Sequence, residues 1–186
     1  MSEPPNAVHV VRSGEGQAIW YGRALMEVKA DAADTGGVFS LLEMTSVPGR
    51  GPGGPPHLHK TAEKSFYILD GSIVLDIVGG ESIPLSKGDF ITIPRGVPHG
   101  FTITADSGVH LLQFHTPAGQ EEFHREAGTP AAERRPPPTV AIDFTRIGEI
   151  AERHDMVMLT PPRPTSASSP PADERPDNNH PNDGPA

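Results

Sequence analysis

Three histidines have the spacing expected of ligands to a single metal ion. His57 and His59 are separated by one residue, and His99 ends a second segment, Pro94-Arg-Gly96-Val-Pro-His99. In a β-strand successive side chains alternate between faces, so His57 and His59 share a face and can bind one ion together. Imidazole nitrogens suit divalent Fe, Ni, Mn, Cu and Zn with only modest preference. The residue types therefore predict a divalent transition-metal site and leave the identity of the metal open.

The segments that would position these histidines are short, apolar and separated by Gly, Pro and Asp, which is typical of an all-β domain. Gly79-Gly80 and Asp70-Gly71 are predicted to form hairpin turns. Many hairpins at short spacing favour antiparallel sheets closed into a small jelly-roll barrel. The predicted strands are Ile19–Tyr21, Ala24–Ala30, Val38–Val47, Ser65–Leu69, Ile73–Val78, Phe90–Ile93, Phe101–Thr104 and Val109–Phe114.

Helical patterns follow the strands. Residues 120–127 favour a helix that Gly128 would end. Asp143 can cap a second helix, which runs to about His154. The residues predicted to share one face of this second helix are Phe144, Ile147, Ala151 and His154.

The chain is thus predicted to hold one barrel domain with extensions at both ends. Residues 1–13 would form a flexible N-terminus, residues 14–117 the β-barrel, and residues 118–160 a helical extension that packs on the barrel. Residues 161–186 are rich in Pro, Ser, Asp and Asn and keep no apolar period. We expect this tail to be disordered.

The composition limits the classes of binding partner and of chemical site that the chain can have. The formal net charge of -9 argues against nucleic acid and anionic membranes, since both are themselves negative. The chain has no cysteine, which excludes disulfides, thiolate metal sites and a cysteine nucleophile. It also shows no basic and apolar leader and no apolar run of about 18 residues. We therefore expect a cytoplasmic protein whose partner is a small-molecule substrate.

The three histidines belong to two motifs, which read Gly51-(x)5-His57-x-His59-(x)4-Lys64-(x)6-Gly71 and Gly88-(x)5-Pro94-x-Gly96-(x)2-His99. These motifs resemble the signature motifs of the cupin superfamily, except that Ile103 stands where the second family motif ends in Asn. The resemblance extends over roughly residues 14–162, and the chain is similar to single-domain cupins related to bacterial quercetin 2,3-dioxygenase. It implies an antiparallel cupin jelly-roll barrel in which His57, His59 and His99 bind the metal.

The chain departs from the family where the family places a metal-binding glutamate, because Lys64 stands there. Strand parity puts Lys64 on the same face as Phe66, and the neighbouring Glu63 on the other face unless a bulge intervenes. A carboxylate would bind the ion and accept a proton from a substrate hydroxyl, whereas an ammonium does neither. Either the neutral Lys64 amine acts as a general base or Schiff-base nucleophile, or the ion is absent and Lys64 holds an anionic ligand.

Other candidates have weaker support. Phe66 and Phe101 share parity with Lys64 and His99, which favours substrate-binding positions in the pocket. His110 and His115 have opposite parity, so only one can point inward, and surface or packing roles are predicted for both. The histidines outside the motif region, predicted to be structural or solvated, are His9, His124, His154 and His180.

The resemblance implies one reaction and leaves others open. Oxygen-dependent cleavage of an aromatic or enolic metabolite, in the manner of quercetin 2,3-dioxygenase, is the first. Because the glutamate is replaced, an oxygen-independent isomerase or cyclase that uses Lewis-acid polarisation is the second. A non-catalytic metabolite-binding protein with an altered metal site is the third. Many cupins pair through sheet edges, and by that analogy we expect a homodimer.

Overall fold

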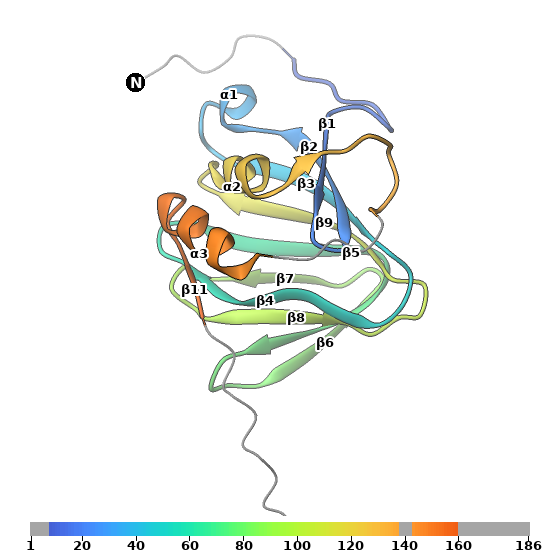
Figure 1. Ribbon diagram of the computed structural model, residues 1–186, viewed down its shortest axis with the longest axis vertical. Helices are drawn as coiled ribbons and strands as arrows, with labels where there is room; N and C mark the ends of the chain where they lie inside the picture. Colours follow the sequence, from blue (N-terminus) through green and yellow to red (C-terminus); the bar gives the residue numbers. More distant parts are fainter. Residues whose placement is uncertain (1–7, 138–142, 160–186) are drawn as a thin grey trace, which may run out of the picture.

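The computed structural model describes residues 8–137 and 143–159. Its strands form two antiparallel sheets that face each other, as in a jelly roll (Figure 1). The all-β fold predicted from the sequence, with its helical C-terminal extension, is confirmed. The predicted disordered tail lies outside the described residues. Within the described residues, no helix is long and apolar enough to cross a membrane.

The first sheet is built mainly from the N-terminal strands. Its strands follow the order β10, β1, β2, β3, β9, the first half of β5, and β7. The bounds of these strands are Thr129–Pro130 for β10, Gln17–Tyr21 for β1, Ala24–Ala30 for β2, Ser40–Ser46 for β3, Val109–Thr116 for β9, Glu63–Ile77 for β5 and Phe90–Ile93 for β7.

The second sheet carries the histidines. Its strands follow the order β6, the second half of β5, β8, β4 and β11. The bounds are Ser82–Ser86 for β6, His99–Ile103 for β8, Gly51–His59 for β4 and Met156–Met158 for β11. Four strands lie outside those predicted from the sequence: β4, β6, β10 and β11.

Strand β5 joins the two sheets, and this overturns one sequence prediction. Asp70-Gly71 was predicted to be a hairpin turn, but both residues lie inside β5. Residues 63–71 pair with β7 and β9, whereas residues 72–77 pair with β6 and β8. The register shifts between Ile68 and Asp70, and Gly71 has a positive φ of 80°. The pair of residues therefore bends one long strand from one sheet to the other.

Apolar side chains between the two sheets form the core. Burial alternates along β3, as expected for a strand with one face on the core, so that Leu42 and Met44 point inward. From the other strands, Phe66, Leu75 and Ile103 are fully buried in the same cluster. Burying each of these large side chains contributes about 1.5–3 kcal/mol, so the barrel holds the strands that carry the histidines firmly in place.

The C-terminal extension closes one side of the barrel. Helices α2 (Gln120–Ala127) and α3 (Phe144–Arg153) lie on the same side of the molecule, and β11 leads from α3 along β4 (Figure 1). A short helix not predicted from the sequence, α1 (Ala32–Thr35), follows β2. The residues that pack in a second apolar cluster are Phe123, Ala127, Ile147, Ile150, Ala151 and Met156. Phe144 was predicted to share the packed face of α3, but it is exposed.

The start of α3 offers a test of the predicted cap. The Asp143 side chain accepts hydrogen bonds from the backbone N–H groups of Thr145 and Arg146, both at 3.1 Å. Asp143→Ala removes this acceptor and is expected to lower the free energy of unfolding by about 1 kcal/mol. Urea denaturation measures the change. Asp143→Asn keeps the acceptor and should cost clearly less, and equal losses in both variants would contradict the capping role.

Candidate metal centre

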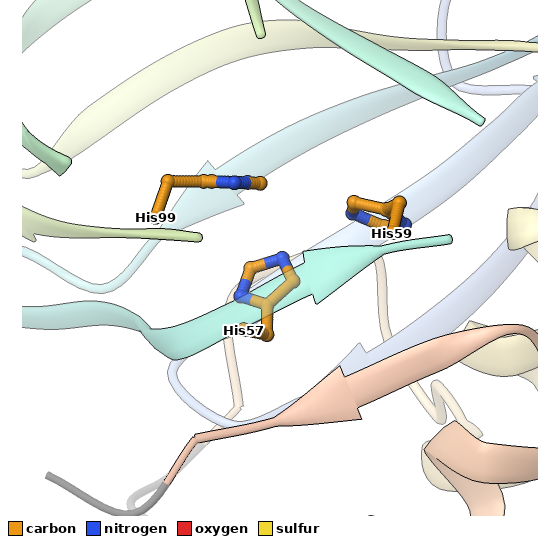
Figure 2. A group of neighbouring side chains, drawn as sticks. All are labelled: His57, His59 and His99. Atoms are coloured by element: carbon orange, nitrogen blue, oxygen red, sulfur yellow. The ribbon is translucent and has the colours of Figure 1, made fainter. Parts of the chain in front are cut away.

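Two neighbouring strands of the second sheet bring the three predicted histidines together. His57 and His59 lie on β4, and His99 begins β8 directly opposite His57. Figure 2 shows the three rings converging, His57 and His59 from one strand and His99 from the next. One ring nitrogen from each lies within 4.8 Å of the other two. We call His57, His59 and His99 the histidine cluster.

Backbone carbonyls fix the tautomers of two members of the cluster. Nδ1 of His57 lies 2.8 Å from the carbonyl oxygen of Pro55, and Nδ1 of His99 lies 2.9 Å from that of Val97. Because a carbonyl oxygen only accepts, each Nδ1 carries the proton and each Nε2 keeps its lone pair. This is the arrangement that metal-binding histidines adopt.

Three other ring nitrogens of the cluster lack a hydrogen-bond partner within the described part of the chain. Nε2 of His99 and both ring nitrogens of His59 are buried without a hydrogen-bond partner. A buried polar atom without a partner is costly. A metal ion on the lone pairs of His59 and His99 would remove that cost at two of these three nitrogens, so the residues present fit a divalent transition metal.

Burial keeps the cluster uncharged. Desolvation lowers the pKa of His99 to about 4 and holds the pKa values of His57 and His59 well below their usual range, with the charge of Lys64 as the next cause. All three imidazoles are therefore neutral near pH 7. Neutral imidazole is the form that binds a metal ion.

Lys64 points into the same site. It is only 5% exposed, and its Nζ lies 3.3 Å from Nε2 of His57 and 5.0 Å from the ring centroid of Phe66. Burial lowers the pKa of Lys64 to about 7. Glu63 points the other way, where it forms an ion pair with Arg95 at 3.3 Å. Position 64 thus contributes an amine at the place where the family motif has a carboxylate.

A small cavity of about 50 Å³ opens beside the cluster, and its wall is largely apolar. Phe101 lines it, as predicted for a substrate-contacting residue. Phe66 lies behind the wall instead, fully buried with its ring centroid 5.5 Å from that of Phe101. The other apolar side chains of the wall are Tyr21, Ala24, Met26, Met44, Pro55, Phe123, Met156 and Met158.

Two further histidines lie close to the site, although the sequence predicted surface, packing or solvated roles for them. His115 is fully buried and its ring centroid lies 5.3 Å from that of His59. His124, from α2, lines the cavity, and burial lowers its pKa to about 3. His110 points outward and contacts Glu43 at 2.6 Å. Strand register could have found His115, because it pairs across strands with Lys64.

Comparison with known proteins agrees with this fold. Residues 43–115 match the cupin domain family. The chain is 28% identical over 162 residues to quercetin 2,3-dioxygenase of Bacillus subtilis (strain 168), which covers 86% of this chain and 47% of that protein. It is 26% identical over 130 residues to quercetin 2,3-dioxygenase of Aspergillus japonicus, covering 67% of this chain and 37% of that protein. The chain thus spans about half or less of the length of these relatives.

Solved structures share the fold at low sequence identity. The nucleoside dehydratase Pac13 of Streptomyces superposes with a TM-score of 0.51 at 12% identity, covering 62% of this chain and 88% of Pac13. KdgF from Halomonas sp. has a TM-score of 0.51 at 15% identity, covering 62% of this chain and 99% of KdgF. Residues 43–115 thus match a cupin domain, and over 86% of its length the chain is similar to quercetin 2,3-dioxygenase of Bacillus subtilis.

Proposed function

We propose that this chain is a metal-dependent cupin enzyme that acts on a small aromatic or enolic molecule, with quercetin 2,3-dioxygenase-like oxygenation as its reaction. The observation that carries the proposal is the convergence of three neutral imidazoles, two of which, His57 and His59, line an apolar cavity. Similarity to quercetin 2,3-dioxygenase over most of the chain supports the reaction class.

The proposed roles follow from where each side chain lies. The histidine cluster would hold the metal, which when bound supplies Lewis-acid polarisation of a substrate oxygen. Phe101 and the methionines of the wall exclude water and contact the apolar part of the substrate. The Lys64 amine lies within the site and is assigned the exchange of a proton with the substrate hydroxyl.

Lys64 also favours a second candidate. The described residues that line the cavity include no Asp or Glu. A site that lacks a carboxylate suits an oxygen-independent reaction equally well. In such a reaction the metal polarises a carbonyl group of the substrate, as in an isomerase or cyclase. If no turnover occurs, the same cavity would capture a metabolite without changing it.

Metal content and oxygen uptake together test the proposal. We expect the purified full chain to retain about one transition-metal ion per protein after dialysis, measured by elemental analysis. With the flavonol quercetin as probe, we expect oxygen uptake that matches the loss of flavonol absorbance. Treatment with a chelator should stop both, and reloading the metal should restore both.

The other outcomes overturn parts of the proposal. Conversion of the probe in the absence of oxygen would replace the dioxygenase reaction with an oxygen-independent one. Saturable binding of the probe without conversion would indicate a binding protein. A protein that neither retains nor takes up metal would contradict the role of the histidine cluster.

A further inference from the structure

The amine nitrogen of Lys64 lies close to one nitrogen of the histidine cluster. Nζ is 3.3 Å from Nε2 of His57. Two nitrogen ligands that bind one ion at about 2.0–2.1 Å are about 2.8–3.4 Å apart, for angles between a right angle and the tetrahedral angle. The observed separation therefore matches two ligands of the same ion.

The lone pair on Nε2 of His57 faces the amine. Nε2 keeps this lone pair because the Nδ1 proton of His57 is donated to the carbonyl oxygen of Pro55. The separation of 3.3 Å suits either a hydrogen bond from the amine to the lone pair or two nitrogens that bind one ion. The surroundings of the amine distinguish these two arrangements.

The surroundings of Lys64 do not supply the partner that a buried ammonium needs. Its side chain is 5% exposed, and among the described residues that line the cavity there is no carboxylate. The adjacent carboxylate, Glu63, is committed to Arg95 on the opposite face of β5. A buried ammonium without a counter-ion is strongly disfavoured. An amine whose lone pair binds a metal ion has no such deficit.

We infer that the Lys64 amine is a fourth ligand of the metal ion, completing a site of four nitrogens with the histidine cluster. The inference rests on the proposed function, since it presupposes that the cluster binds a metal. It refines the proposed role of Lys64: the amine binds the ion in the resting protein and is free to take a proton once a substrate oxygen replaces it. As with other nitrogen ligands, binding requires loss of the proton.

The direction in which a Lys64 substitution changes metal affinity shows whether Lys64 is a ligand or only a charged neighbour. If Lys64 binds the ion, Lys64→Gln and Lys64→Met each weaken binding of Co²⁺ to the chelator-stripped full chain by about 10- to 100-fold. If Lys64 remains a charged neighbour, removing its charge relieves repulsion and binding becomes tighter. Competition titration with a chelator measures the change, and Lys64→Met preserves most of the side-chain volume.

A spectroscopic readout separates ligation from a change in the fold. The visible absorption of bound Co²⁺ reports the ligand set, and we expect it to shift in Lys64→Gln and Lys64→Met but not in a control. Lys87→Gln is the matched control, because Lys87 is an exposed lysine that pairs with Asp70 at 3.4 Å. Circular dichroism and thermal melting check that the variants stay folded.

Each result has a defined meaning. Weaker Co²⁺ binding with a shifted spectrum supports the four-nitrogen site. Equal or tighter binding in both variants overturns it while leaving the histidine cluster as the metal site. Failure of the unchanged protein to bind Co²⁺ overturns the inference and the proposed function together.

A carboxylate at the same position gives an independent prediction. Lys64→Glu replaces the amine with an anionic ligand that neutralises part of the charge of the ion. We expect Co²⁺ to bind at least as tightly as in the unchanged protein, again measured by chelator competition. Weaker binding in this variant would show that position 64 does not face the ion.

Discussion

Replacing His57 and His59 together with glutamine is expected to abolish metal retention while the barrel stays folded. The change removes two of the three imidazoles that converge within 4.8 Å of one another. Losing even one partner of a metal site costs about 10- to 100-fold in affinity, and losing two ligands costs more. We therefore expect Kd for Co²⁺ to rise by at least about 100-fold, measured by chelator competition and by elemental analysis after dialysis.

A matched control separates this effect from a general loss of histidine. His110→Gln changes a histidine on the outer face of β9, where it contacts Glu43 rather than the cavity. It should leave metal retention unchanged. The double variant should melt within a few degrees of the unchanged protein, because glutamine fills most of the vacated volume. A double variant that retains metal at the original ratio would show that the cluster is not the metal site.

The sequence predicted that His57 and His59 share a face, because this prediction requires only one strand. Alternation of faces along β4 suffices to place His57 and His59 side by side. Placing His99 beside them needed more, namely the pairing of β4 with β8, which only the family resemblance suggested. The inward position of Lys64 followed from parity again, and the structure places its amine beside the cluster.

The strand that carries the pair was itself hard to predict. Residues 51–59 contain three glycines and three prolines, which are residues with low strand propensity. The strand exists because β8 and β11 pair with it on both sides. These contacts join segments far apart in the chain, so no local pattern in residues 51–59 reports them.

The cavity wall was unpredictable for the same reason. His124, Met156 and Met158 come from the C-terminal extension and reach the site only because α3 and β11 fold back onto the barrel. Local signals predicted the helices well: α2 spans residues 120–127 as expected, and Asp143 caps α3. They carry no information about which sheet edge the extension covers.

The turn wrongly predicted at Asp70-Gly71 lies at a position where the fold depends on one residue, Gly71. The combination of Asp and Gly is a common hairpin signal, and it arises here because the same positive φ is needed for a different purpose. At Gly71, β5 leaves its partner β9 and turns into the second sheet. A Cβ added there would lie 2.1 Å from the backbone carbonyl oxygen of Gly108.

Gly71→Ala is therefore expected to destabilise the barrel strongly. Its φ of 80° costs a non-glycine residue about 1–2 kcal/mol. The contact with the Gly108 carbonyl cannot relax through a side chain, since backbone must move, and this adds about 1–3 kcal/mol. We expect a loss of about 2–5 kcal/mol in the free energy of unfolding, measured by urea denaturation.

Gly88→Ala isolates the conformational part of that loss. Gly88 has a similar φ of 92°, but no atom lies within 4 Å of an added Cβ. This variant should lose only about 1–2 kcal/mol. The difference between the two variants measures how tightly β5 and Gly108 approach where the strand changes sheets.

Because β5 carries Lys64 on one side of the crossing and pairs with β8 on the other, loosening the crossing should also weaken metal binding in Gly71→Ala, but not in Gly88→Ala. Equal stability losses in the two variants would mean that the strand crossing tolerates a side chain, contrary to the close contact seen at Gly108.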